Sequence, residues 1–165
     1  MEPLFFELIE VLKQQQQVVT NMVTAAQAQN QALRQVDAQA LSSAVNQLQK
    51  LTLQMAKLDP QREQLQVKLE QNLGLKPGAT VSDMLAQAPV EIQIPLKQLQ
   101  TELKQQFDKL QQLNQVNRVL TQRVQQVNAA LVNIMHPSNN SQTYQPGGKV
   151  NKETTSNLQM LNKTV

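Results

Sequence analysis

Cysteine is absent from the 165-residue chain. Its absence excludes disulfide bonds, thiolate metal sites and a cysteine nucleophile. The chain begins without the basic and then apolar segments of a secretory signal, and no apolar run approaches the roughly 20 residues that a transmembrane helix needs. We therefore expect no secretory signal and no membrane insertion, and the absence of cysteine is compatible with a reducing compartment without proving one.

Aromatic residues are scarce as well, at 2% of the chain, with no tryptophan, one tyrosine and three phenylalanines. The bulky rings that usually fill a deep globular core are therefore missing. Only four glycines and seven prolines are present, and glutamine, leucine, alanine and valine dominate, which favours helix over strand. This composition predicts an elongated helical bundle.

Apolar residues recur at alternating spacings of three and four along three long segments, which is the pattern of a helix seam. The seams run from Phe5 to Val36, from Leu41 to Leu69 and from Leu96 to Ile134. They predict an all-α fold, an elongated antiparallel bundle of three long helices with one short helix and a flexible C-terminal tail. The predicted helices span residues 3–35, 38–72, 81–88 and 95–135.

The residues between the seams are typical of helix ends. Asp37 can cap the second helix within a very short reversing turn. Gly74 can take the left-handed conformation that ends that helix. Thr80 and Asp83 have the spacing of a capping box at the start of the short helix. The sequence therefore predicts where the chain turns.

Two prolines bear on the course of the helices. Pro60 lies inside the second seam, where it removes a backbone hydrogen bond. The helix can kink there, or stop and restart with Asp59 as its cap; because the seam keeps its phase, we favour the kink. Pro95 is expected to open the last long helix, and His136-Pro137 to end it.

The composition changes after Pro137. Serine, asparagine, threonine, glycine and lysine dominate residues 138–165, with too little apolar surface to offset the entropy of ordering. We therefore divide the chain into a helical bundle domain, 1–137, and a flexible tail, 138–165. Leu158, Leu161 and Val165, with Met160 nearby, have the spacing of an amphipathic face that could fold against a partner, although chance spacing explains it equally well.

Residues suited to catalysis do not form a pattern. His136 is the single histidine, and no carboxylate cluster accompanies it. The sequence contains none of the phosphate-binding, nucleophile-elbow or zinc-protease motifs. We therefore expect no enzyme, no catalytic residues, no metal and no cofactor. The net charge of +3 comes from scattered lysines and arginines, so we expect no nucleic-acid binding either.

Polar amides interrupt the seams at Gln15, Gln29, Gln106 and Asn117. An unsatisfied amide at a buried position costs about 1–3 kcal/mol. Bundles use such residues to reject other alignments, so we favour a role in helix register. Direct recognition of a partner is the alternative.

Several short segments resemble the FlgN-type flagellar export chaperones, which are long helical proteins that escort hook-associated proteins. The order and spacing of Asn117-Arg118, the helix end and Tyr144 are the more specific part of this similarity. The segments are V-D-A-Q-A-L at Val36 to Leu41, L-G-L at Leu73 to Leu75, T-V-S-D-M-L at Thr80 to Leu85, L-N-Q-V-N-R-V-L at Leu113 to Leu120 and T-Y-Q-P-G-G at Thr143 to Gly148.

The resemblance implies a cytoplasmic chaperone of the flagellar type III secretion system. Its partners would be hook-associated proteins of the FlgK/FlgL type, kept from premature assembly, and the export gate protein FlhA. Tyr144 would contact the gate, while Asn117 and Arg118 belong to the signature and can be structural. The residues expected to bind cargo lie on the last helix and in the tail: Leu120, Val124, Val127, Leu131, Leu158, Met160 and Leu161.

Other classes of function stay open at this point. A structural coiled-coil or adaptor protein with no export role would have the same seams but a dispensable tail. A helical nucleic-acid binder would need its lysines and arginines on one face. A homo-oligomer, with or without helix exchange between two chains, is also possible.

Overall fold

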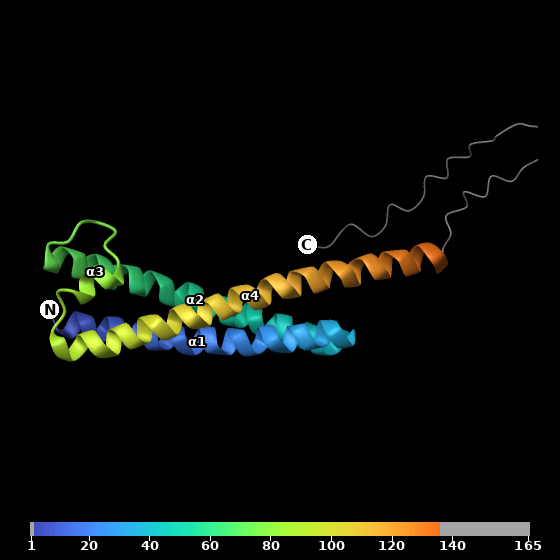
Figure 1. Cartoon of the computed structure of the whole chain (residues 1–165), viewed down its shortest axis with the longest axis horizontal. Coiled ribbons are helices and arrows are strands. Elements are labelled where there is room, and N and C mark those ends of the chain that lie inside the picture. Colours follow the sequence, from blue (N-terminus) through green and yellow to red (C-terminus); the bar gives the residue numbers. More distant parts are fainter. Residues whose placement is uncertain (1, 136–165) are drawn as a thin grey trace, which may run out of the picture. The chain divides into compact units, whose positions relative to one another are not determined.

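The computed structural model describes residues 2–135, which form four helices and no strand (Figure 1). These are α1 (Glu2–Gln35), α2 (Ala38–Leu73), α3 (Val81–Leu85) and α4 (Val90–Met135). The predicted all-α class, with three long helices and one short helix, is confirmed. Residue 1 and residues 136–165 lie outside the described residues, and so does the predicted tail.

The chain divides into two compact units, residues 1–127 and 128–165. The first unit contains α1, α2, α3 and most of α4. Of the second unit, residues 128–135 are helical and all exposed. The packing of the helices is therefore a property of the first unit.

The helices α1 and α2 form an antiparallel hairpin whose turn is as short as the sequence predicts. The carboxylate of Asp37 accepts a hydrogen bond from the Ala40 N–H at 2.9 Å and so caps α2. The Asp37 N–H itself donates to the Ala32 carbonyl at 3.0 Å, which closes the end of α1. One residue thus ends one helix and begins the next, as the predicted cap requires.

Val36 does not belong to the seam of α1, and its predicted place there is wrong. It lies in the turn, 71% exposed, with a φ of 56°. A residue after the last helical turn must enter the left-handed region for the chain to reverse within so few residues. For a β-branched side chain this conformation is strained.

Replacing Val36 by glycine should therefore raise the free energy of unfolding by about 1 kcal/mol, because the relief of left-handed strain exceeds the extra chain entropy of glycine. Urea unfolding followed by circular dichroism measures the change. Val45, an exposed valine inside α2, provides the control. Val45→Gly should lower stability by a few tenths of a kcal/mol, about the propensity difference. Equal effects of both changes would contradict strain at Val36.

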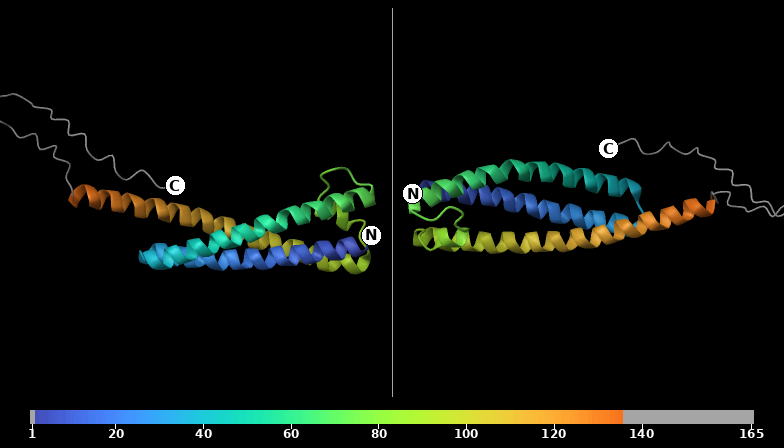
Figure 2. Two further views of the ribbon diagram at one scale, coloured as in Figure 1. Left: turned by 180° about the vertical axis from the view of Figure 1, so that it is seen from behind. Right: turned by 90° about the horizontal axis from the view of Figure 1, so that it is seen from above.

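The helix α4 runs parallel to α1. Gln16 donates a hydrogen bond to Glu102, and Asn30 donates to Asn117 at 2.8 Å. The two pairs are separated by 86 and 87 residues along the chain, and such a constant offset is what parallel helices produce. Figure 2 shows the three long helices of the first unit lying alongside one another. Since α1 packs against both neighbours, it buries the widest face.

The second helix continues through Pro60 without a break, so the stop and restart considered above does not occur. Gln15 on α1 donates to the Asp59 carboxylate at 2.8 Å, which leaves Asp59 bonded across the hairpin. Figure 2 shows α2 following a curved path. A proline in a long helix commonly bends it in this way.

The starts and ends of the other helices differ in two places from the prediction. α4 begins at Val90 instead of Pro95, and α3 ends at Leu85 instead of Ala88. Ile92, which is fully buried, extends the helical face of α4 upstream, and its N–H donates to the Pro89 carbonyl at 2.9 Å. Packing of Ile92 thus outweighs the hydrogen bond that Pro95 cannot make.

The loop between α2 and α4 contains the predicted caps. Gly74 is left-handed, with a φ of 66°, and ends α2. Thr80 and Asp83 form the capping box of α3, with the Thr80 N–H donating to the Asp83 carboxylate at 2.8 Å and the Asp83 N–H donating to the Thr80 hydroxyl at 3.2 Å. The hydrogen bond from the Thr80 hydroxyl, and then that from its backbone, holds the pKa of Asp83 below its usual value.

The apolar core is unevenly distributed along the first unit. Its larger cluster contains the fully buried side chains of Phe5, Leu8, Leu69, Met84 and Leu96, all near α3. The smaller cluster, toward the α1–α2 turn, consists of Val23, Ala26 and Leu110. The part of α4 beyond Leu110 therefore packs on a thin core.

Candidate partner-binding face of α4

A layer of amide side chains joins α4 to α1. Asn117 is 3% exposed, and its amide nitrogen donates to the Ala26 carbonyl and the Gln29 side chain, both at 2.9 Å. Its oxygen accepts from Asn30 at 2.8 Å, and Asn30 accepts in turn from Arg34 at 2.8 Å. All hydrogen-bonding atoms of the Asn117 amide thus have partners inside the bundle, except for one lone pair.

The other seam amides behave similarly or are partly exposed. Gln15 is buried and bonded to Asp59, and Gln29 is half-buried and bonded to Asn117. Gln106 is half-buried on α4. Internal hydrogen bonds account for Gln15, Gln29 and Asn117, which favours a role in register over direct recognition of a partner. Arg118, the other signature residue, is exposed.

The seam of α4 loses its cover beyond Asn117. Leu120 and Val124 are half-buried, while Val127 is 59% exposed; in the second unit Leu131 is 51% exposed. Asn30, which pairs with Asn117, lies close to the end of α1, so α1 ends roughly five residues farther along. The predicted cargo-binding positions on α4 are therefore partly or fully accessible.

A row of side chains on α4 combines two residues of this seam, Leu120 and Val127, with three neighbours that were not identified from the sequence. We call it the α4 stripe: Lys109, Val116, Leu120, Arg123 and Val127. The spacings of seven, four, three and four place these residues on one face of a helix. Apart from the half-buried Leu120, all of them are exposed. The spacing could have revealed the row, but periodicity alone does not say which seam is covered.

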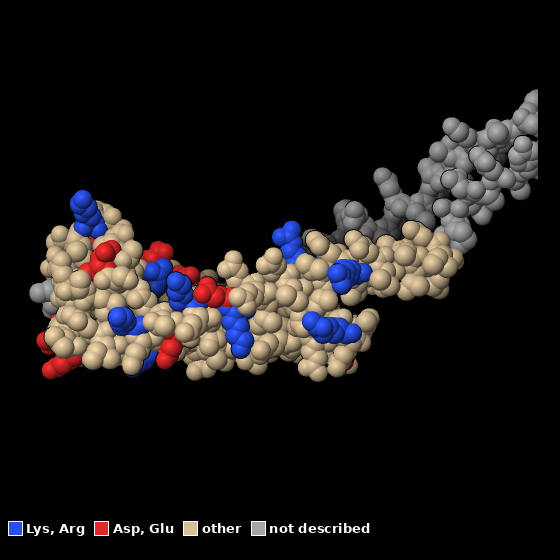
Figure 3. Space-filling model, viewed as in Figure 1, with Lys and Arg blue, Asp and Glu red and all other residues tan. Residues whose placement is uncertain are grey.

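Charge is unevenly distributed between the two halves of the first unit. We define the turn half as residues 16–58 with 103–127, and the α3 half as residues 2–15 with 59–102. On the face in Figure 3, acidic side chains concentrate toward α3, and basic ones prevail toward the turn. The turn half has Asp37 and Asp108 as its carboxylates, against Arg34, Lys50, Lys57, Lys104, Lys109, Arg118 and Arg123.

Ion pairs follow the same division. Among residues 2–135, Lys13 pairs with Glu10 at 2.8 Å, and Arg62 lies 3.9 Å from Asp59 and 3.7 Å from Glu63. All these residues belong to the α3 half. The basic side chains of the turn half form no ion pair with another described residue, and all of them are exposed. Their positive charge is therefore available to a partner.

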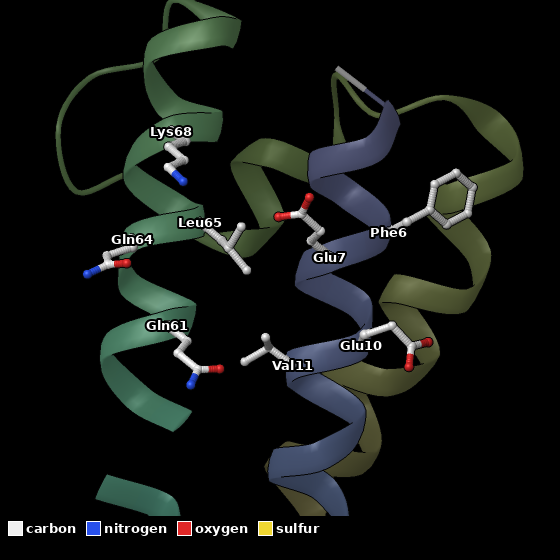
Figure 4. Close-up of a pocket in the computed structure, with 8 residues that line it drawn as sticks. All are labelled: Phe6, Glu7, Glu10, Val11, Gln61, Gln64, Leu65 and Lys68. Atoms are coloured by element: carbon white, nitrogen blue, oxygen red, sulfur yellow. The ribbon is translucent and has the colours of Figure 1, made fainter. Parts of the chain in front are cut away.

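A groove between α1 and α2 lies in the α3 half (Figure 4). Val11 and Leu65 point toward one another across it, whereas Phe6 points away from α2. The rim is polar, and the remaining lining residues are Glu7, Glu10, Gln61, Gln64 and Lys68. No group of metal-ligating side chains occurs there or elsewhere in residues 2–135. The groove shows no arrangement of catalytic groups.

The remaining predicted site residues are Tyr144, Leu158, Met160 and Leu161. They lie outside the described residues, as does His136, so their roles stay predictions. Within the described part of the chain, none of the helices is both long and apolar enough to cross a membrane.

Comparison with known protein families decides the identity. The model of the family described as FlgN protein matches residues 1–152. The chain belongs to the FlgN family. No curated protein and no solved structure shows significant similarity to it. The resemblance found in the sequence is thus confirmed, and this FlgN protein falls in a family of flagellar chaperones and not in a family of enzymes.

Proposed function

We propose that this FlgN protein is an export chaperone of the flagellar type III secretion system. In this proposal it binds hook–filament junction subunits of the FlgK/FlgL type, prevents their premature assembly and delivers them to the export gate. The observation that carries the proposal is the loss of cover along α4, where Leu120 and Val124 are half-buried and Val127 is exposed. Exposed apolar side chains in a row on a helix commonly mark a protein-binding surface.

The binding mode follows from this surface. A cargo helix that lays its apolar face along α4 would cover the side chains that α1 leaves exposed. Such a contact is released without a nucleotide, because its affinity is limited by the entropy of ordering the cargo segment. On the resemblance, Tyr144 is the proposed contact to FlhA, and Leu158, Met160 and Leu161 are further cargo contacts.

Calorimetry with a peptide from the C-terminal helix of a hook–filament junction subunit tests the proposal. We expect a dissociation constant in the micromolar range or lower. Val127→Ser should weaken binding about tenfold or more, since covering one valine stabilises a complex by about 1.5–3 kcal/mol. Deleting residues 138–165 should weaken binding too.

A matched variant in the α3 half serves as the control. Val67 on α2 is also exposed, and Val67→Ser should leave the affinity unchanged. Absence of binding to any hook–filament junction subunit would sink the proposal. Equal losses for Val127→Ser and Val67→Ser would remove α4 as the binding surface.

A further inference from the structure

We infer that the α4 stripe binds an amphipathic helix with acidic side chains on both flanks of its apolar face. The inference rests on the proposed function, because we assign this helix to the export cargo. It adds the chemistry by which the chaperone recognises that cargo.

The spacing defines what the partner must carry. Lys109 and Arg123 lie fourteen residues apart on one face of α4, a distance of about 20 Å along a helix. Val116 and Leu120 lie between them, and Val127 follows Arg123 by one turn. The complementary helix therefore has apolar residues at its centre and carboxylates about 20 Å apart, or roughly fourteen residues.

The charge of the stripe is not neutralised within the described chain. Lys109 and Arg123 are exposed and form no ion pair with another described residue. Arg118 and Lys104, on other sides of the same helix, add to the net positive charge of the turn half, in which Asp108 is the one carboxylate on α4. A carboxylate of the partner would be attracted by this field before contact, and the long lysine and arginine stems would cover its apolar face after contact.

A second copy of this chain is a poorer occupant of the stripe. Two parallel stripes would place Lys109 against Lys109 and Arg123 against Arg123. Two antiparallel stripes centred on Val116 would place Lys109 against Arg123. Both alignments bring like charges together around the same three apolar residues, Val116, Leu120 and Val127, which opposes association.

Two designed helical peptides provide the probe. They share one apolar face, and one has glutamates and the other lysines at flanking positions fourteen residues apart. We measure binding to the full chain by fluorescence anisotropy at about 50 mM and about 300 mM salt. We expect the glutamate peptide to bind at least tenfold more tightly at low salt, with most of this preference lost at high salt.

Charge reversal locates the effect. The double variant Lys109→Glu with Arg123→Glu should reverse the preference for the two peptides. The control changes net charge equally in the α3 half, by Lys76→Glu with Lys97→Glu, and should keep the preference. Circular dichroism of each variant verifies that the helices persist. The inference is overturned if the variant with Lys109→Glu and Arg123→Glu still prefers the glutamate peptide. It is also overturned if that preference is lost only in the control variant.

Binding of the intact junction subunit separates the inference from the proposed function. If the subunit binds and the peptides are not discriminated, the acidic partner is wrong while the chaperone role stands. If the glutamate peptide binds and no junction subunit does, the proposed function fails and the stripe is retained. A single-stranded RNA oligonucleotide that binds the wild type more tightly than the glutamate peptide does, and loses this affinity in the charge-reversed variant, would overturn the inference.

Discussion

Phe5→Ala should lower the free energy of unfolding by about 3–5 kcal/mol, the usual cost of deleting a buried phenylalanine ring. Phe5 is 0% exposed and is the largest of the fully buried side chains. It belongs to the cluster that joins α1 to α2, α3 and α4. Since few aromatic residues are available, no neighbouring ring can fill the cavity, and most of the loss should appear in the measured stability.

The next residue provides the control. Phe6 is 57% exposed and points away from α2 (Figure 4). Phe6→Ala should change stability by less than about 1 kcal/mol, because little buried area is lost. Urea unfolding of both variants, followed by circular dichroism at 222 nm, compares them directly. Similar losses would contradict the packing of α1 described above, because they would require the two rings to be equally buried.

Local chemistry made much of the fold predictable. The capping residues show this most clearly. The side chains of Asp37 and of the Thr80–Asp83 box can bond the free N–H groups at the start of a helix, and Gly74 can adopt the left-handed conformation at the end of one. Each is found at such a helix end. These signals need only a few neighbouring residues. For this reason they could be read without knowing what packs against them.

Features that depend on packing were less predictable. The start of α4 at Val90 follows from the burial of Ile92, which outweighs the proline signal at residue 95. Val36 continues the seam in sequence, yet the short turn forces it into the left-handed region. A local rule fails in both cases because a contact distant in sequence, or the geometry of chain reversal, has the larger energy.

The candidate site shows the same limit. A seam predicts which side chains can be buried together, but it does not say how far the partner helix extends. The end of α1 soon after Asn30 leaves Val127 exposed, although it has the same heptad position as Leu113, which is half-buried and packs against the smaller cluster. Lys109, Val116 and Arg123 of the α4 stripe were missed for this reason, since their importance depends on which side chains of α4 are left uncovered.

The thin core under α4 beyond Leu103 gives the amide layer its importance. Up to that residue, Leu96, Leu99 and Leu103 hold α4 in the large cluster. Toward the turn, Leu110 contacts only Val23 and Ala26 among the buried side chains of its cluster. Apolar packing of this size allows neighbouring registers with little difference in energy, so hydrogen bonds must select one of them.

Asn117→Leu should therefore release the turn half of α4 from its single position on α1. The chain has no cysteine, so spin labels at Gln27→Cys and Gln115→Cys, both exposed, report one defined distance. With the wild-type residue Asn117, the distance between the two labels, measured by pulsed electron paramagnetic resonance, should have a narrow distribution. The Leu variant should give a broad or split one, with a second population about 10 Å away if α4 slips by one heptad.

Asn114→Leu is the matched control, because Asn114 lies on the same helix and is exposed. It should keep the narrow distribution. Leucine at residue 117 fits the apolar rule of the seam better than asparagine does, so apolar burial alone predicts a tighter and narrower pairing. A narrow distribution in Asn117→Leu would show that packing is enough to set the register. A broad one requires the hydrogen bonds from Asn117 to Ala26 and Gln29 to hold α4 where its stripe stays exposed.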